Sequence, residues 1–310
     1  MSNILIIKHG SLGDLIQANG AIKDIKNFYP NRKVFLLTTQ PYSIFMSECP
    51  YLDGVLIDKR LPRWNLLYLN NLKKTLSKYD FSKVFDLQNS SRTKFYKRFI
   101  IKNIEWSSTE TVLEPGQRKS DFDKDPVLDR MEIQLKKSGI ETEFTKNIDL
   151  NWAVENTSDL VKKYTNREYI LLFPFCSPKL KNKKWPYYKE LIQKLKQEFK
   201  NKYSVLLAPG PNEIKDAAEL NAKVVLENNE HVTLMTLVSL IYSAKLIIAN
   251  DTGPAHIASH LDKKGLVLFG SHTSAKKVSI ENFNFKAISV KNLKDLDVNT
   301  VLKEVKAKLD

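Results

Sequence analysis

The chain has 310 residues, 42% of them hydrophobic and 27% charged, which is the composition of a folded globular protein and excludes an intrinsically disordered one. The two cysteines, Cys49 and Cys176, form no motif and so exclude a disulfide framework and a cysteine-ligated zinc cluster. No apolar run reaches the roughly 18 to 20 residues that span a bilayer, and the run at the N-terminus is too short for a signal peptide, so we expect a cytoplasmic protein.

Lysine and arginine (49) outnumber aspartate and glutamate (35), which gives a formal net charge of +14. Such a charge suits nucleic acid, acidic lipid headgroups or phosphorylated small molecules as partners. Lysine is abundant throughout the chain, so a compositional bias is an alternative explanation. The cations are scattered and no RNP-like or helix-turn-helix motif is present, so we do not expect a nucleic-acid-binding protein.

The first half of the chain alternates predicted strands with predicted helices. Apolar runs predict strands at 3–8, 34–38, 54–58 and 83–87, and helical spacing predicts a helix up to residue 28 after the first strand. This alternation predicts a doubly wound parallel sheet, which binds its ligands at the carboxyl ends of the strands. Asp14 and the stretch Asp86-Leu-Gln88-Asn89 fall at such ends.

Cations interleave with aromatic residues over 90–101, as in an amphipathic basic helix. This helix is either a solvated surface element or a face for an anionic ligand or a membrane. Residues 107–125 are polar, and we expect them to form an irregular, mobile loop over the ligand cleft. Helical spacing returns at 127–137 and 154–164, and we place a domain boundary after residue 165.

A second series of strands and helices begins at the apolar run 169–173. The loop after it holds Ser177 and four lysines, among them Lys183, and leads into a helix whose first turn contains Trp185-Pro186. A hydroxyl and a lysine at the end of a strand suit a diphosphate, although loop lysines are commonly solvated. Glu213, at the start of a later helix, either accepts hydrogen bonds from a ribose or stabilises the helix dipole.

The motif N-D-T-G-P-A-H at 250–256 follows an apolar strand and runs into a helical pattern. Asp251, Thr252 and Gly253 therefore lie at a strand-to-helix turn, where unpaired backbone N–H groups and the helix dipole favour an anion. Gly253 allows a phosphate to approach the main chain. The alternative is that Asp251 or Thr252 is only the N-cap of the helix.

Five loops follow one another in a fixed order. They are K-H-G-S-L-G-D at 8–14, D-L-Q-N at 86–89, F-P-F-C-S-P…K-K-W-P at 173–186, A-P-G-P-N-E at 208–213, and N-D-T-G-P-A-H at 250–256 followed by L-F-G. Together they resemble the heptosyltransferase family, the ADP-heptose:lipopolysaccharide glycosyltransferases, over nearly the whole chain. The resemblance implies a GT-B fold, in which two Rossmann-like, doubly wound α/β domains face a cleft. Residues 1–165 would bind the acceptor, and residues 166–310 the nucleotide sugar.

The resemblance also implies an inverting, metal-independent sugar transfer, with Asp14 as the catalytic base and Lys183 acting on the leaving diphosphate. The donor-binding residues that it implies are Ser177, Lys183, Glu213, Asp251, Thr252, Gly253 and His256. The acceptor-binding residues that it implies are Lys8, Ser11, Gly13, Gln88, Asn89 and Arg92. Two features depart from the family pattern: Asn89 replaces the usual glycine, and Gly270-Ser-His-Thr-Ser274 replaces the usual G-P-T-D-P loop.

The expected reaction moves heptose or a related sugar from a nucleotide diphosphate donor, ADP-heptose by the resemblance, to a hydroxyl of a lipopolysaccharide core or similar glycan. It requires no cofactor beyond the nucleotide sugar, and we expect an anionic glycolipid or glycan acceptor and peripheral contact with the cytosolic face of the inner membrane. Asp121-Phe-Asp123 and the His256/His260 pair form no convincing metal site. The alternatives are a nucleotide-sugar epimerase or hydrolase on the same fold, and a basic nucleic-acid-binding protein.

Overall fold

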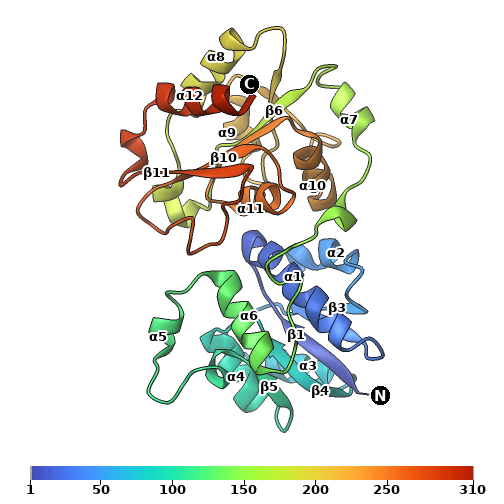
Figure 1. Cartoon of the computed structure of the whole chain (residues 1–310). Helices are drawn as coiled ribbons and strands as arrows, with labels where there is room; N and C mark the ends of the chain where they lie inside the picture. The colour runs from blue at the N-terminus through green and yellow to red at the C-terminus, as the bar shows by residue number, and fades with distance from the viewer. Residues whose placement is uncertain (1, 310) are drawn as a thin grey trace. The chain divides into compact units, whose positions relative to one another are not determined.

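The computed structural model describes residues 2–309, apart from the side chains of residues 178, 179 and 181. It divides into two compact units, Met1–Trp152 and Ala153–Asp310, and each contains one parallel β-sheet covered by helices (Figure 1). None of the helices in residues 2–309 combines the length and the apolar character needed to cross a bilayer.

The sheet of the first unit has five parallel strands in the order β3-β2-β1-β4-β5. The strands are β1 (Asn3–Ile7), β2 (Val34–Thr38), β3 (Gly54–Ile57), β4 (Phe81–Asp86) and β5 (Glu105–Ser107). The helices are α1 (Leu12–Phe28), α2 (Gln40–Ser47), α3 (Leu66–Leu76), α4 (Ser91–Phe99), α5 (Lys119–Phe122) and α6 (Val127–Lys137). The strand order reverses direction between β1 and β4, which makes their carboxyl ends the place where such a sheet binds ligands.

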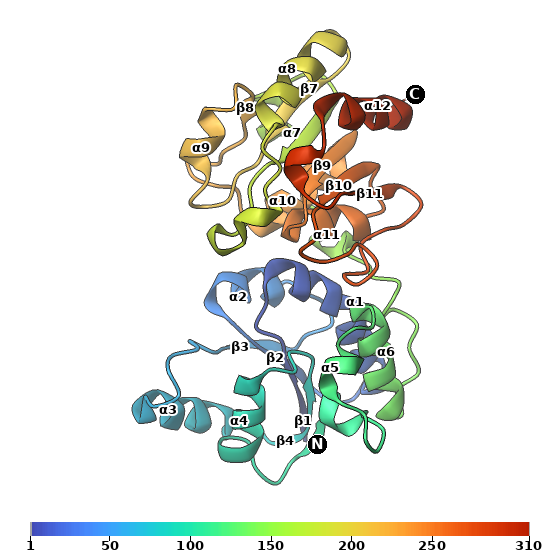
Figure 2. The same ribbon diagram turned by 90° about the vertical axis from the view of Figure 1, so that its left-hand side faces the viewer.

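Successive residues of β1 point to opposite faces of the sheet, and each face buries a different set of helices. Leu5 and Ile7 pack with buried residues of α3 and α4, including Tyr68 and Tyr96. In α3 the buried residues follow helical spacing at positions 68, 69, 72 and 76. Figure 2 shows α3 and α4 on one side of the sheet and α1 and α6 on the other.

One prediction for the first unit is wrong, and one strand of it was missed. The polar stretch 107–125, predicted to be an irregular loop, contains a 3-10 turn (Thr109–Thr111) and the one-turn helix α5. Phe122 of this helix is buried, and Asp123 forms ion pairs with Lys119 and with Arg130 (3.1 Å), so burial and charge pairing order the stretch. The short strand β5 was not predicted.

The sheet of the second unit has six parallel strands in the order β11-β10-β9-β6-β7-β8. The strands are β6 (Tyr169–Phe173), β7 (Ser204–Leu207), β8 (Lys223–Val224), β9 (Leu246–Asn250), β10 (Gly265–Phe269) and β11 (Phe285–Ser289). The helices are α7 (Ser158–Lys162), α8 (Tyr188–Glu198), α9 (Ile214–Ala218), α10 (Leu234–Ser243), α11 (Gly253–His260) and α12 (Val298–Leu309). Here the order reverses between β6 and β9, whose carboxyl ends carry the loops 174–186 and 251–253.

The division between the units falls before Ala153 rather than after residue 165. Residues 153–165 belong to the second unit because Glu155 N–H donates to Ser239 Oγ (2.8 Å) and Tyr164 OH donates to Leu226 O (2.9 Å). The helix predicted at 154–164 is confined to Ser158–Lys162, none of whose residues is buried. The Trp185-Pro186 pair precedes α8 instead of lying in its first turn.

Candidate functional site

The candidate base Asp14 lies in the first turn of α1, directly after the loop that leaves β1. Its Oδ2 accepts hydrogen bonds from Ser11 N–H and from Ser11 Oγ, both at 2.9 Å, in a capping box at the N-terminus of the helix. Lys8 Nζ lies 3.8 Å from the other oxygen, Oδ1, and the Asp14 side chain is 42% exposed. The carboxylate is thus held in a fixed orientation and remains accessible, as proton abstraction from an acceptor hydroxyl requires.

Lys8 is buried and acts on both loops of the β1/β4 switch point. Its Nζ donates to Leu87 O (3.0 Å), the carbonyl that follows β4. Burial lowers the pKa of Lys8, and the charges of Asp14 and Asp86 oppose that shift. Lys8 therefore ties the Asp14 loop to the loop after β4.

The backbone of the Lys8–Asp14 loop depends on Gly10, which has φ +98°, a conformation that side-chain-bearing residues rarely adopt. A Cβ at this position would lie 2.4 Å from a ring carbon of Tyr42, so alanine would be strained and would clash as well. Gly13, one of the predicted acceptor residues, is buried in the first turn of α1.

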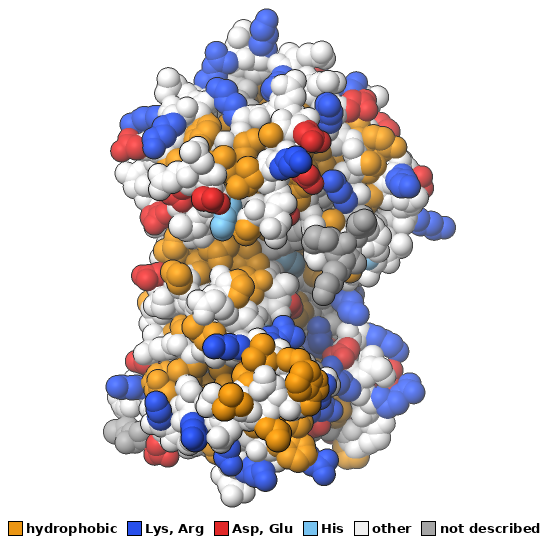
Figure 3. Space-filling model, turned by 180° about the vertical axis from the view of Figure 1, so that it is seen from behind, with side chains coloured by type: hydrophobic (Ala, Val, Ile, Leu, Met, Phe, Trp, Pro, Cys, Tyr) orange, Lys and Arg blue, Asp and Glu red, His pale blue; other side chains and the backbone are white. Residues whose placement is uncertain are grey.

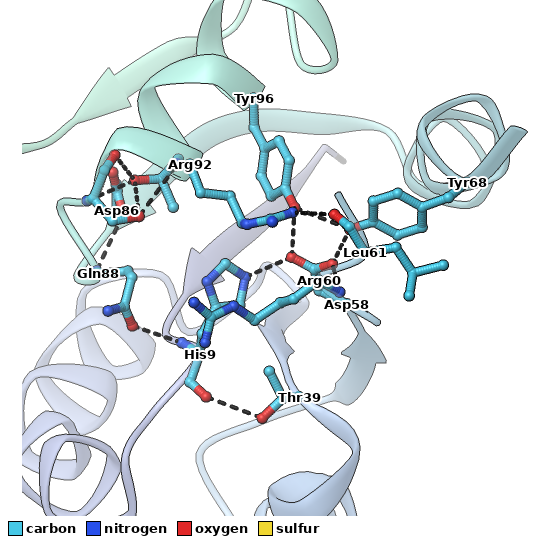
Figure 4. A network of polar contacts seen from close by, with 12 residues as sticks. His9, Thr39, Asp58, Arg60, Leu61, Tyr68, Asp86, Gln88, Arg92 and Tyr96 are labelled. Atoms are coloured by element: carbon cyan, nitrogen blue, oxygen red, sulfur yellow. Dashed lines mark hydrogen bonds and ion pairs between the residues drawn. The ribbon is translucent and has the colours of Figure 1, made fainter. Parts of the chain in front are cut away.

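A buried polar cluster, which we call the Asp58 cluster, supports this loop from beneath. It consists of Asp58, His9, Tyr68 and Tyr96 (Figure 4). His9 Nε2 lies 2.9 Å from Asp58 Oδ2, which also accepts from Tyr96 OH (2.7 Å), while Asp58 Oδ1 accepts from Tyr68 OH. Burial alone would raise the pKa of Asp58, but the hydrogen bonds from the cluster lower it to about 2, so the carboxylate is ionised at neutral pH.

The predicted acceptor residues Gln88, Asn89 and Arg92 all contact this assembly or the loop that adjoins it. Gln88 Oε1 accepts from His9 N–H (2.9 Å), and Arg92 Nη1 donates to Tyr96 OH (3.1 Å) and to Leu61 O (2.9 Å). The first unit thus brings Lys8, Ser11, Gly13, Asp14, Gln88 and Asn89 together on two neighbouring loops. Arg92 lies in the first turn of α4, beside them.

Asn89 has φ +49°, in the left-handed region where glycine and asparagine are the favoured residues. Its Nδ2 donates to Gln134 Oε1 (3.0 Å), and its Oδ1 accepts from Thr109 N–H (2.6 Å). Asparagine is thus compatible with this left-handed backbone conformation, and its side chain also binds α6 and the segment after β5.

In the second unit, the strand-to-helix turn after β9 holds a buried, charge-paired carboxylate. Asp251 Oδ2 accepts from Lys183 Nζ (2.6 Å) and lies 3.0 Å from His272 Nε2, and Asp251 Oδ1 lies 3.8 Å from His256 Nε2. Burial favours a raised pKa for Asp251, but Lys183 and the two histidines hold it below its usual range. This turn, predicted from the sequence, is confirmed: β9 ends at Asn250, Thr252 is the N-cap, and α11 begins at Gly253.

Asn250 fixes the lysine loop against this turn. Its Nδ2 donates to Pro174 O (2.9 Å), and its Oδ1 accepts from Trp185 N–H (3.2 Å). Because Trp185 is fully buried and its indole donates to Leu296 O (2.9 Å), the loop is fixed just after Lys183. Lys183 is 20% exposed, so its ammonium group is partly accessible from solvent.

The other donor-side predictions are placed less tightly. Ser177 is exposed in the lysine loop, and the side chains of Lys179 and Lys181 lie outside the described residues. Glu213 occupies the N-cap position of α9, its Oε2 accepts from Gly210 N–H (2.8 Å) in the preceding loop, and burial raises its pKa. His272, which contacts Asp251 and stacks on Phe269, comes from the loop that departs from the family pattern and was not predicted to be a site residue.

The two carboxylates of Asp121-Phe-Asp123 are both engaged in ion pairs. Asp121 contacts Arg118 (3.1 Å) and Lys124 (2.9 Å), and Asp123 contacts Lys119 and Arg130. Burial lowers the pKa of His260 to about 3, so this residue is neutral. Within residues 2–309 no group of three or more His, Cys, Asp or Glu side chains is arranged to hold a metal ion.

Two Rossmann-like units, each with charged loops at its switch point, give the chain the GT-B fold. The same fold is found in E. coli heptosyltransferase WaaC with ADP (TM-score 0.74, 18% identity, 99% of each chain covered). It also occurs in E. coli ADP-heptose lps heptosyltransferase II (TM-score 0.75, 19% identity, 99% of this chain and 98% of that one).

A family model described as glycosyltransferase family 9 (heptosyltransferase) matches residues 69–303, and the chain belongs to this family. It is therefore a glycosyltransferase. A curated relative, lipopolysaccharide heptosyltransferase 1 of Campylobacter coli, is 23% identical over 339 aligned residues, with 95% of this chain and 92% of the relative covered.

Proposed function

We propose that the protein transfers heptose or a closely related sugar from ADP-heptose to a hydroxyl of a lipopolysaccharide core or similar glycan. The observation that carries the proposal is the Lys183–Asp251 pair at the N-terminus of α11. A helix N-terminus beside a lysine is suited to a diphosphate. Of the similar structures, one is E. coli heptosyltransferase WaaC with ADP and another is an E. coli ADP-heptose lps heptosyltransferase, and the curated relative is named for lipopolysaccharide.

In the proposed reaction the acceptor hydroxyl attacks the anomeric carbon of the sugar from the face opposite the diphosphate. The new C–O bond forms as the bond to the diphosphate breaks, and Asp14 takes the proton of the hydroxyl. Lys183 and the N–H groups at the start of α11 stabilise the negative charge that develops on the diphosphate. These groups supply the required acid-base and electrostatic chemistry, so the proposed transfer needs no metal. Attack from the face opposite the diphosphate inverts the anomeric configuration.

His272 and His256 have a separate part in this proposal. When Lys183 turns toward the diphosphate, the buried Asp251 would lose its closest cation, and a buried carboxylate without a partner is strongly destabilising. The two histidines, at 3.0 and 3.8 Å, remain as its partners. Glu213, which precedes α9 in the loop after β7, is the proposed acceptor for the ribose hydroxyls.

The test is an assay of sugar transfer and ADP release with ADP-heptose and a lipid-free core oligosaccharide. Asp14→Asn should abolish transfer and leave ADP affinity unchanged, whereas the exposed control Asp80→Asn should behave as wild type. Lys183→Met should weaken ADP binding in calorimetry by about 10- to 100-fold, because a charge-assisted contact contributes roughly 1.5–3 kcal/mol. The exposed Lys189→Met is its matched control.

Three outcomes would count against the proposal. Wild-type turnover of Asp14→Asn would remove Asp14 from the chemistry. Unchanged ADP affinity of Lys183→Met would move the diphosphate site elsewhere. A sugar product formed at full rate without any acceptor would favour an epimerase or hydrolase.

A further inference from the structure

Large apolar side chains are exposed where β3 is followed by α3. Trp64 is 80% exposed, Leu66 75% and Leu67 73%, and Leu61 in the same segment is 39% exposed. We call Leu61, Trp64, Leu66 and Leu67 the apolar tip. Exposed apolar residues that occur singly need no explanation, but four within seven positions form a contiguous surface of the kind that marks an interaction site.

The apolar tip is not a by-product of core packing. The core residues of α3 are Tyr68, Leu69, Leu72 and Leu76, and Asn65 caps the helix by accepting from Tyr68 N–H (3.0 Å). Leu66 and Leu67 lie in the first turn and face away from this stripe. Polar residues at these positions would preserve both the cap and the core, so the fold itself does not require the apolar tip.

The apolar tip belongs to one of two neighbouring stretches of the chain that contain no acidic residue. Residues 59–79 contain six Lys or Arg and no Asp or Glu, and residues 90–104 contain five Lys or Arg and no Asp or Glu. The two stretches are neighbours, because Tyr68 OH lies 3.0 Å from Tyr96 OH and Arg63 Nη1 donates to Ser91 O (3.4 Å). In Figure 3, hydrophobic side chains gather among Lys and Arg side chains on this side of the first unit.

Some of these cations are already paired within the protein, and others are available to an external anion. Lys94 and Lys97 pair with Glu110 (2.9 and 3.3 Å), and Arg92 bonds within the Asp58 cluster. Among the described residues, Lys59, Arg60 and Arg63, which lie beside or within the apolar tip, form no ion pair with an acidic side chain.

We infer that the apolar tip and its flanking cations dock the enzyme onto an anionic lipid bilayer. An indole at the boundary between headgroups and acyl chains, flanked by Lys and Arg, is the combination that binds peripherally to membranes. The charge complementarity favours a lipid surface over a second copy of this basic chain, whose own cations would repel it.

Docking would also place the switch-point loops near the headgroups. The apolar tip follows Asp58, whose Oδ1 accepts from Arg60 N–H (2.7 Å) and whose Oδ2 lies against His9 of the Asp14 loop. If the acceptor is the glycolipid of the proposed function, the enzyme would encounter it in the same membrane surface that the apolar tip binds. The docking surface itself does not depend on which sugar is transferred.

The test is sedimentation with vesicles of phosphatidylglycerol and phosphatidylethanolamine, compared with phosphatidylcholine vesicles, without any sugar present. Wild type should bind the anionic vesicles, and less so as salt rises. The double variant Trp64→Ser/Leu67→Ser should lower the partition coefficient by about tenfold or more. Lys59→Glu/Arg63→Glu should lower it and weaken its salt dependence. Phe283→Ser, which removes an 88% exposed side chain in the second unit, should leave it unchanged.

Tryptophan fluorescence gives a second measurement. Trp106 and Trp185 are buried and Trp152 is partly buried, so a blue shift on vesicle binding should come from Trp64 and be absent in the double variant. Equal binding to neutral and anionic vesicles would overturn the inference, as would wild-type partitioning of the double variant. The inference would also be overturned if light scattering showed that wild type forms a dimer without lipid and that the double variant is a monomer. Transfer to the lipid-free acceptor tests the proposed function separately.

Discussion

Replacing Asp58 by asparagine should strongly destabilise the first unit, although residue 58 has no predicted role in catalysis. The carboxylate accepts from Tyr68 OH, Tyr96 OH and Arg60 N–H and contacts His9 Nε2. Its pKa of about 2 lies below the reference value of 3.8, and a depression of that size corresponds to about 2 kcal/mol of stability at neutral pH. The amide would also place N–H donors where the cluster supplies donors of its own.

We therefore expect Asp58→Asn to lower the free energy of unfolding by about 2–4 kcal/mol at pH 7. For a unit of this size, that loss corresponds to a fall in Tm of about 5–12 °C. The assay is calorimetric unfolding, with the exposed Asp80→Asn as a matched control that should leave Tm within about 1 °C of wild type.

The pH dependence separates the charge effect from a simple packing defect. Because the folded-state pKa of Asp58 is depressed, its stabilisation is complete above the unfolded pKa of about 3.9 and is lost as the pH falls through about 2. The difference between wild type and Asp58→Asn should therefore be constant from about pH 5 to 7 and should narrow below about pH 4. A difference that stays constant down to pH 2, or a variant as stable as wild type at pH 7, would refute this account of the cluster.

Three further predictions concern the switch-point loops. Asn89→Ala should destabilise the protein more than Asn89→Gly, by about 1 kcal/mol in urea unfolding, because glycine adopts φ +49° without the strain that alanine would have; equal losses would contradict this. Glu213→Gln should weaken ADP binding by about tenfold in calorimetry if the carboxylate accepts from the ribose, and unchanged affinity would leave it as a helix cap only. His272→Ala should raise the pKa of Asp251, so that ADP affinity, measured as a function of pH, falls at a higher pH than in wild type. If the fall in affinity at low pH is at the same pH in both proteins, His272 does not act through Asp251.

The regular elements were predictable because their signals are local. An apolar run such as Ile4–Ile7, or a stripe of apolar residues at helical spacing, identifies a buried strand or helix from nearby positions alone. The short edge strands β5 and β8 carry too few residues to show such a pattern. Strand β11 is only partly buried, so its apolar periodicity is weak. The alternation of strands and helices predicts a doubly wound parallel sheet, but it does not fix the order of the strands, which the structure supplies.

The candidate site was predictable only at the ends of strands. Asp251 follows an apolar run directly and Asp14 follows one after a short loop, so their positions at the carboxyl edges can be inferred from their neighbours in sequence. The Asp58 cluster joins residues from 10 to 87 positions apart, and a buried tyrosine hydroxyl resembles any other core aromatic in the sequence. His272 did carry a signal, since it lies in the loop that departs from the family pattern, but its contact with Asp251 depends on how β9 and β10 are aligned.

The distribution of charge decides between the two explanations that the sequence leaves open for the +14 excess. A compositional bias would spread the surplus of lysine and arginine along the chain and leave the cations scattered. Instead, residues 59–79 and 90–104 account for eleven of the fourteen excess positive charges. Helices α3 and α4 bring these two stretches together on one face of one sheet, beside the exposed Trp64 and Leu67. The positive charge is therefore concentrated beside the exposed apolar side chains rather than spread over the protein. A bilayer with acidic headgroups is the partner that binds both the cations and the apolar side chains.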